Sequence, residues 1–249
     1  MAWHIEAVDG CAVVRMNTNK VNVQNALFFA DLHDAFDRLE REFGELPVVL
    51  TGQGDAFSAG IEVDYRGGIG GSGSKDAVRE CYKAYRETNL RIFEYPRPTV
   101  AAVNGHAIAG GLITALDCDF RVAARKPAKF GLNEVPIGIP MPAAYVEIIK
   151  YALGDQVGAL ATLRGKLYTL EEAERLGFFH EVVEPEQLLA TAIGYAKCIT
   201  PDCNTAYAMS KKALHDSVMR QIEERTVALN DYLPAGMGES VAALGFLLT

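Results

Sequence analysis

The hydrophobic positions along this chain follow two periods, one typical of strands and one typical of helices. Alternating apolar residues flank Asp9-Gly10 near the N-terminus, which predicts a β-hairpin closed by a tight turn. Over residues 26–43 apolar side chains recur every three or four positions and predict an amphipathic helix. The short apolar run at 47–51 predicts a buried strand of the kind that parallel sheets contain.

Similar patterns predict the elements of the remaining chain. Residues 52–60 are expected to form a loop, and the glycine- and serine-rich stretch 67–74 a flexible one. Strands and helices interleave up to about residue 185 and helices dominate afterwards, so we expect an α/β core with parallel strands. Further strands are expected at 99–103 and 120–123, and further helices at 76–93, 110–116, 143–153, 155–164, 170–176, 186–198, 204–229 and 239–248.

Composition narrows the class of protein. With 249 residues, of which 49% are hydrophobic and 22% charged, the chain can bury a core without disulfides or metals. The net charge of -8 argues against a nucleic-acid partner, because binding to phosphates requires a basic face. The five cysteines form no C-x-x-C pair and the five histidines show no zinc-binding spacing. We therefore expect free thiols, no metal site and a cytoplasmic protein.

Two stretches each allow a second interpretation. Residues 98–116 carry no formal charge over a length close to that of a membrane span. Asn104-Gly105-His106 and Gly110-Gly111 interrupt this stretch, so we interpret it as a buried strand, a tight turn and a buried helix, and expect no membrane. Residues 68–73 spell G-x-G-x-x-G, but no buried strand directly precedes them, which favours a flexible loop over a dinucleotide site.

Small residues follow two of the predicted buried strands. Ala59-Gly60-Ile61 lie beyond the strand at 47–51, and Ala109-Gly110-Gly111 lie beyond the strand at 99–103. Small side chains let another group approach backbone N–H donors, and Gly110-Gly111 open a helix, where amide hydrogens lack partners. If both loops converge they form an oxyanion hole, whereas each loop taken alone also fits an ordinary tight turn.

A single carboxylate, that of Glu134, stands in the otherwise apolar segment 130–138. Burial there would raise its pKa and suit a general base. A glutamate in a loop can equally face water, so these residues alone leave both interpretations open.

These segments, in this order and at this spacing, resemble the crotonase (enoyl-CoA hydratase/isomerase) superfamily. The resemblance runs from the first hairpin to the C-terminal helices and rests on the colinear set of motifs. It implies a crotonase-like spiral of ββα units, with an α/β core at 1–190 that contains the CoA-ester site and a C-terminal α-helical oligomerisation region at 191–249. The motifs are 55–60 (Asp-Ala-Phe-Ser-Ala-Gly), 101–105 (Ala-Ala-Val-Asn-Gly), Cys118-Asp119, Phe130-Gly131, 170–173 (Leu-Glu-Glu-Ala), Leu176-Gly177 and Val182-Val183.

The resemblance implies that two backbone N–H groups form the oxyanion hole. Those of Ile61 and Gly110 would hold the thioester carbonyl and the enolate made from it. Ala59, Gly60 and Gly111 would lie against the substrate on either side of them.

Where the hydratases of the family carry two glutamates, this chain keeps one. The second corresponds to Glu134, the implied catalytic base, and the first to Ile113, which would lie against the substrate. Because isoleucine cannot activate water, the chain looks closest to the Δ3,Δ2-enoyl-CoA isomerases, which shift a double bond with the second glutamate alone. Asp117, four residues beyond Ile113, could replace the missing carboxylate, but a displacement of about 5.4 Å favours a structural role for it.

The implied activity converts 3-enoyl-CoA to 2-trans-enoyl-CoA, as in fatty acid metabolism, with coenzyme A as part of the substrate and no separate cofactor. Hydration or hydrolysis of acyl-CoA thioesters, and acyl-CoA binding without catalysis, are the alternatives. The resemblance also implies a homotrimer or a dimer of trimers. The apolar residues 244–248 would then dock on the core or on another subunit.

Overall fold

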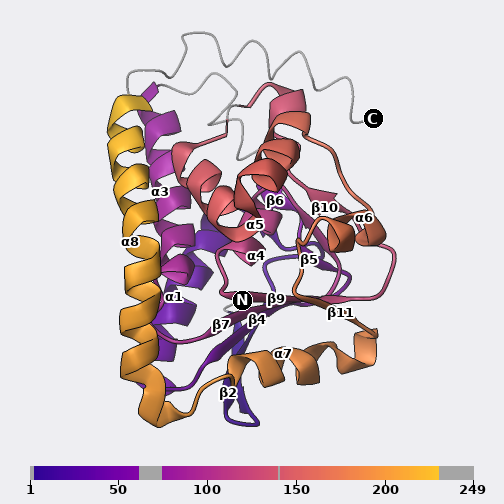
Figure 1. Ribbon diagram of the computed structural model, residues 1–249, viewed down its shortest axis with the longest axis vertical. Helices are drawn as coiled ribbons and strands as arrows, with labels where there is room; N and C mark the ends of the chain where they lie inside the picture. The colour runs from indigo at the N-terminus through magenta and orange to yellow at the C-terminus, as the bar shows by residue number, and fades with distance from the viewer. Residues whose placement is uncertain (1–2, 62–74, 140, 230–249) are drawn as a thin grey trace.

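A six-stranded sheet forms the centre of the molecule, which the computed structural model describes over residues 3–61, 75–139 and 141–229 (Figure 1). The predicted hairpin around Asp9-Gly10 is confirmed, and both turn residues have the positive φ (48° and 81°) that such a turn requires. Each later strand joins the sheet in parallel. In sheet order the strands are β1 (His4–Val8), β2 (Cys11–Met16), β4 (Val48–Gly52), β7 (Thr99–Val103), β9 (Phe120–Ala124) and β11 (Glu181–Val183).

The central strands are buried on both faces and contribute to two cores. Alternate residues of β2 separate accordingly, since Val14 belongs to the larger core and Val13 to the smaller one. Helix α7 (Leu188–Ala196) covers the smaller core, below the sheet in Figure 1. Burial on both faces explains why β4 and β7 are unbroken apolar runs rather than alternating ones.

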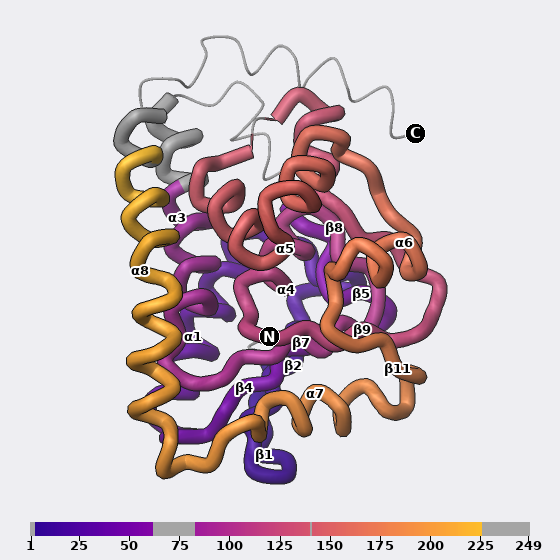
Figure 2. The backbone as a smooth tube through the Cα atoms, viewed as in Figure 1, coloured from indigo at the N-terminus to yellow at the C-terminus, as the bar shows by residue number. Residues whose placement is uncertain are grey.

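The other helices lie on the opposite side of the sheet, and Figure 2 shows α8 running beside α3 along one edge of the molecule. Helix α5 joins two predicted helices, which break at Gly154, where φ is 75° and ψ is 161°. The helices are α1 (Ala26–Glu42), α3 (Lys75–Phe93), α4 (Gly110–Leu116), α5 (Ala143–Arg164), α6 (Leu170–Arg175) and α8 (Asn204–Leu229), with short 3-10 helices η1 (Val135–Ile137), η2 (Pro185–Gln187) and η3 (Pro201–Cys203).

Two small sheets occupy segments in which the sequence predicts no strand. β5 (Ala56–Ser58), β8 (His106–Ile108) and β10 (Phe130–Gly131) form one parallel sheet, and β3 (Val23–Gln24) pairs with β6 (Gly60–Ile61) in the other. The prediction of an uninterrupted loop at 52–60 is therefore wrong. Strands of two or three residues are too short to show an alternating pattern.

The uncharged segment 98–116 forms β7, β8 and α4, which confirms its predicted strand and helix, whereas the strand β8 follows where only a turn is predicted. Among the described helices, none combines the length and the apolar character needed to cross a membrane. The predicted helix 239–248, with its apolar end, and the glycine-rich stretch 67–74 lie outside the described residues.

Candidate active site

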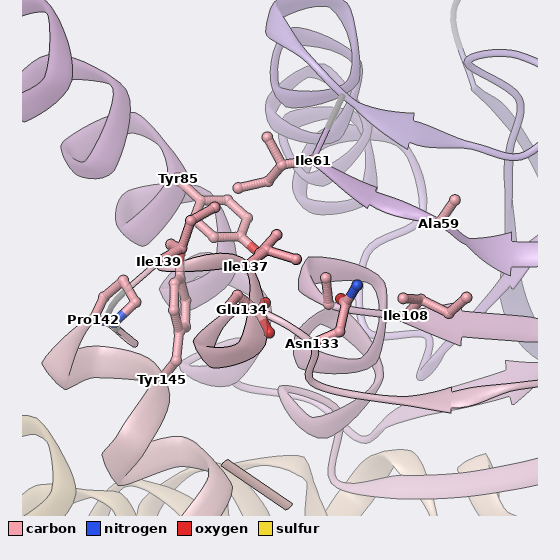
Figure 3. Close-up of a pocket in the computed structure, with 11 residues that line it drawn as sticks. Ala59, Ile61, Tyr85, Ile108, Asn133, Glu134, Ile137, Ile139, Pro142 and Tyr145 are labelled. Atoms are coloured by element: carbon pink, nitrogen blue, oxygen red, sulfur yellow. The ribbon is translucent and has the colours of Figure 1, made fainter. Parts of the chain in front are cut away.

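A pocket lies between the β5–β6 segment, the start of α4 and the segment that follows β10 (Figure 3). Isoleucines make up much of its wall, and a few polar side chains face into it, which is the usual character of a small-molecule site. The lining residues are Ala59, Ile61, Tyr85, Ile108, Ala109, Asn133, Glu134, Ile137, Ile139, Pro142 and Tyr145.

Buried polar side chains hold the first wall, the segment from Ser58 to Ile61. The Asn22 amide nitrogen donates to the carbonyls of Ala56 (3.1 Å) and Phe57 (3.2 Å). The Ser58 hydroxyl donates to the Asn22 carbonyl at 2.7 Å and accepts from the Gly60 N–H at 3.2 Å. The backbone that carries the predicted Ile61 donor is thus fixed by contacts within the core.

The second wall is the start of α4, where backbone geometry sets the direction of one N–H group. The Ala109 carbonyl accepts from the N–H groups of Leu112 (2.9 Å) and Ile113 (3.2 Å). In a trans peptide the N–H points opposite to the C=O, so the N–H of Gly110, in the same peptide, points out of the helix start. Ala109 itself has φ 51° and ψ −126°, a strained conformation for a residue with a side chain.

The two walls touch each other. A β-carbon on Gly60, whose φ is +80°, would lie 2.6 Å from the Ile108 carbonyl oxygen and 3.1 Å from the Gly110 nitrogen. A β-carbon on Gly111 would likewise lie 2.9 Å from the Ser58 β-carbon. The structure therefore brings together the two glycine-containing segments that the sequence predicts to converge.

Glu134 lies on the remaining wall, at the start of η1, and Figure 3 shows it at the centre of the labelled residues. Strand β10 pairs in parallel with β8, which leads into α4, and this pairing carries Glu134 to the same pocket. Its backbone carbonyl accepts from the N–H groups of Ile137 (3.1 Å) and Ile139 (2.9 Å). The residue is half-buried, and its Oε2 is shielded from solvent.

The other predicted site residues are placed as follows. Ala59 and Ile61 line the pocket together with Glu134, whereas Gly60, Gly110 and Gly111 are buried and are not among the lining residues. Ile113 is completely buried in the larger core and is not among the residues that line the pocket.

Asp117, at the end of α4, is 1% exposed and also lies apart from the lining residues. Neither of its carboxylate oxygens has a hydrogen-bond partner among the described residues. Burial raises the pKa of Asp117 well above its ordinary value, and the nearby charge of Lys211 offsets this only in part. The expected hydrogen bond of Asp117 is therefore not found in the described part of the chain.

Sequence reasoning missed the polar side chains that share the pocket with Glu134. Asn133 precedes the predicted base directly, whereas Tyr85 and Tyr145 come from α3 and α5, and their rings meet edge to face at 4.7 Å. Helical periodicity predicts that such residues are buried but not which cavity they border. The sequence does show one polar residue, Thr114, inside the otherwise apolar helix α4, but this residue does not line the pocket.

The arrangement suits chemistry on a carbonyl compound whose α-proton must be removed. Backbone amides at a helix start can stabilise an oxyanion, and a carboxylate in an apolar pocket can act as the base. Among the described residues, no group of three or more His, Cys, Asp or Glu side chains is arranged to hold a metal ion.

Comparisons with known proteins agree with this chemistry. The sequence profile described as enoyl-CoA hydratase/isomerase matches residues 6–235. The chain is 34% identical to a putative enoyl-CoA hydratase of Thermus thermophilus over 183 aligned residues, and the alignment covers 74% of this chain and 71% of that protein. It is 30% identical to mitochondrial enoyl-CoA delta isomerase 1 of Homo sapiens over 190 aligned residues, and this alignment covers 76% of this chain and 62% of that protein.

The fold points to the same group of proteins. The crystal structure of human mitochondrial Δ3-Δ2-enoyl-CoA isomerase superposes with a TM-score of 0.87 at 25% identity and covers 100% of this chain and 98% of that one. Proteins named as hydratases and proteins named as isomerases both occur among these relatives. The mixed α/β core with a helical C-terminal region is the crotonase-like architecture that the motifs predict. The chain therefore belongs to the enoyl-CoA hydratase/isomerase family.

Proposed function

We propose that this protein is a Δ3,Δ2-enoyl-CoA isomerase with Glu134 as its single acid–base group. The Glu134 carboxylate removes a proton from C2 of a 3-enoyl-CoA, and the electrons of that C–H bond pass into the thioester to form a dienolate. The N–H groups of Ile61 and Gly110 stabilise the negative charge on the thioester oxygen. Protonated Glu134 returns the proton to C4 while the double bond forms between C2 and C3, so no atom is gained or lost.

One observation carries this proposal: Glu134 is the one carboxylate among the described residues that line the pocket. A double-bond shift needs a single group that takes and returns a proton. Addition of water needs one group to activate the water and another to protonate carbon. The position at which the resemblance would place the second carboxylate holds Ile113, and that side chain is buried in the core.

Hydration of a 2-enoyl-CoA is the second candidate, because several relatives are named as hydratases. The remaining polar side chains of the pocket are Tyr85, Asn133 and Tyr145. An amide is not a base, and a neutral phenol is a far weaker base than a carboxylate. These side chains could hold a water molecule by hydrogen bonds, but activation of that water would again depend on Glu134.

The deciding experiment incubates the protein with 3-hexenoyl-CoA and follows the ultraviolet absorption of the conjugated product. We expect isomerisation, and in Glu134→Gln a loss of turnover of at least about 100-fold with binding of the CoA ester retained. Glu186→Gln, at an exposed position outside the pocket lining, is the matched control and should keep full turnover.

Three other outcomes would replace the proposal. A hydratase would remove the conjugated absorption of 2-hexenoyl-CoA faster than it forms this absorption from 3-hexenoyl-CoA. Release of free CoA thiol would identify a hydrolase. Saturable binding of both esters without any turnover would identify an acyl-CoA-binding protein.

We further propose a cytoplasmic homotrimer, or a dimer of two trimers. Large apolar side chains remain exposed on α5 and α8, among them Leu163 (73%), Met209 (70%) and Leu214 (63%), and a second copy of the chain would cover such surface. Light scattering coupled to size-exclusion chromatography tests the assembly, and a monomer at micromolar concentration would contradict it.

A further inference from the structure

Gln24 is a completely buried glutamine at the end of β3, next to the pocket. Its side-chain nitrogen donates to the Gly110 carbonyl oxygen at 3.0 Å and to the Thr114 hydroxyl at 2.9 Å. Because a carbonyl oxygen only accepts, the first contact also fixes which end of the amide is the nitrogen. The side chain therefore binds the first residue of α4 from outside the helix.

The backbone of Gln24 is paired with the other wall of the pocket. β3 and β6 are parallel, with Val23 opposite Gly60 and Gln24 opposite Ile61. One residue thus contacts both segments that carry the proposed N–H donors, Ile61 through strand pairing and Gly110 through a side-chain hydrogen bond.

Gly110 needs such contacts because glycine does not restrict its own backbone conformation. A β-carbon at this position would collide with the Tyr85 hydroxyl and with Oε1 of Gln24, so a larger residue would displace both of these side chains. The peptide before Gly110 is fixed through the Ala109 carbonyl, which accepts from two helical N–H groups. The peptide after Gly110 is fixed through the Gly110 carbonyl, which accepts from Gln24 and from the Thr114 hydroxyl at 3.0 Å.

The contact continues as a buried polar network that reaches the pocket wall. The Thr114 hydroxyl has one proton, which it can donate either to the Gly110 carbonyl or to Oδ1 of Asn89 at 3.2 Å. The Asn89 amide nitrogen lies 3.4 Å from the hydroxyl of Tyr145. Gln24, Thr114 and Asn89 are each at most 1% exposed. The start of α4 is therefore linked to a lining residue of α5 through side chains that solvent does not reach.

The second polar atom of Gln24 argues that stability alone does not explain this residue. Its Oε1 is buried and has no hydrogen-bond partner among the described residues. A buried acceptor without a partner disfavours folding, and an apolar side chain of the same shape would avoid this penalty. An apolar side chain would, however, lose the hydrogen bond that the Gln24 amide nitrogen donates to the Gly110 carbonyl.

We propose that Gln24 is a positioning residue that holds the two N–H donors of the oxyanion hole in a fixed relation to each other. This inference rests on the proposed function, because it assigns the donors to Ile61 and Gly110. Gln24 does not touch the substrate. It acts through Gly110 on one side and through the backbone of Ile61 on the other.

The test compares wild-type protein with Gln24→Met, which keeps the length of the side chain and removes both polar atoms. We expect kcat for 3-hexenoyl-CoA to fall by about 10- to 100-fold, because small displacements of catalytic groups have effects of this size. KM should change by less than about threefold, because the donors matter most in the transition state. The midpoint of thermal unfolding should not fall, since the unpartnered Oε1 is removed together with the donor.

A spectroscopic readout reports on the hole without turnover. Hydrogen bonds to the thioester oxygen of 2,4-hexadienoyl-CoA polarise its conjugated system and shift its ultraviolet absorption band to longer wavelength. We expect this red shift on binding to wild-type protein and a smaller shift on binding to Gln24→Met.

Thr51→Val is the matched control. The buried Thr51 hydroxyl donates to the Ala102 carbonyl at 2.8 Å and lies outside the lining of the pocket. Its removal should lower the unfolding midpoint while kcat and the red shift stay at wild-type values, which is the reverse of the pattern expected for Gln24→Met.

Each outcome decides both proposals separately. Wild-type kcat and red shift in Gln24→Met would overturn the role of Gln24 and leave the isomerase proposal intact. A wild-type protein without turnover, whose red shift is lost in Gln24→Met, would overturn the isomerase proposal and support the positioning role. If the wild-type protein bound the ester without a red shift, the assignment of the two N–H donors and the role of Gln24 would be overturned, whereas the double-bond shift would still be decided by turnover of 3-hexenoyl-CoA.

If Gln24→Met does not fold, the same contact can be tested from α4. Thr114→Val removes the hydroxyl that accepts from the Gln24 nitrogen and donates to the Gly110 carbonyl, whereas Thr114→Ser keeps this hydroxyl. A reduced red shift in the valine variant that serine restores would support the network, and equal shifts in both would contradict it.

Discussion

The ammonium of Lys211 on α8 lies 2.8 Å from Oδ1 of Asp119, the residue that precedes β9. Both side chains are largely buried, at 6% and 12% exposure. The same carboxylate accepts from the Tyr207 hydroxyl (2.9 Å) and the Thr99 N–H (2.8 Å). Helix α8 is therefore joined to the central sheet through one buried carboxylate.

Replacement of Lys211 by Met should destabilise the protein by about 3–5 kcal/mol, because it leaves the Asp119 charge buried without its cation. Urea denaturation followed by circular dichroism measures this. Arg220→Ala breaks the exposed ion pair with Asp216 on the same helix, where the partners are 67% and 58% exposed, and should change stability by less than about 0.5 kcal/mol. Equal effects of both substitutions would contradict the structure of this cluster.

His215 should make stability depend on pH below neutrality. Its ring is 4% exposed and stacks on Phe93 at 3.7 Å, and burial lowers its pKa to about 4, assisted by Lys211 and opposed by Asp119. Between pH 6.5 and about 4 the unfolded chain binds a proton at this residue and the folded protein does not, so stability falls as the pH falls. The decrease should reach up to about 3 kcal/mol and should be absent from the stability profile of His215→Phe.

The control for this profile is His4→Gln. The side chain of His4 is 65% exposed, so this variant controls for the loss of a histidine at the surface. If His215→Phe retained the full wild-type slope between pH 6.5 and 4, the burial of a neutral His215 would be refuted.

Asp117→Asn should stabilise the protein at neutral pH without lowering turnover. The pKa of Asp117 is raised by burial, so the folded protein retains a proton that the unfolded chain loses, and the residue weakens stability as the pH rises above about 3.9. We expect a gain of about 1–3 kcal/mol at pH 7 that diminishes toward pH 4. Asp155→Asn, at an 85% exposed position, is the neutral comparison. A loss of turnover in Asp117→Asn would assign the second carboxylate role to this residue.

Gly60→Ala should abolish activity, and it should destabilise the protein by more than the backbone strain of a positive φ alone explains. The new β-carbon would collide with the Ile108 carbonyl and push against Gly110 and Ala109. Gly177 has a similar φ of +75° with no atom within 4 Å of a β-carbon, so Gly177→Ala reports only the strain of about 1 kcal/mol. We expect turnover to fall by at least about 100-fold in Gly60→Ala and to remain unchanged in Gly177→Ala.

Periodicity and turn chemistry predict the large elements of this fold from the sequence. The amphipathic pattern at 26–43 corresponds to α1, and the Asp9-Gly10 turn closes the first hairpin as predicted. β6 and β8 escape prediction because their two or three residues gain their pairing partners only in the tertiary structure. These are the strands that bring the walls of the pocket together.

In the candidate site, too, some residues can be predicted from the sequence and others only from the tertiary structure. Glu134 and the glycine-containing loops stand out in the sequence as a colinear set of motifs, although each of them taken alone also fits an ordinary loop or turn. Gln24 and Tyr85 have no such local signal. Their relevance depends on the strand pairing of Gln24 with Ile61, 37 residues apart along the chain, and on the contact of Tyr85 with Gly110, 25 residues apart.

The order of the strands in the central sheet has a consequence for synthesis on the ribosome. From β1 to β11 each strand lies next to the strand that precedes it in this sheet along the chain, without exception among the described strands. The nascent polypeptide can therefore extend the sheet at one open edge as each segment emerges, with no earlier strand waiting for a distant partner. Such an order reduces the time during which unpaired strand edges are exposed to other chains.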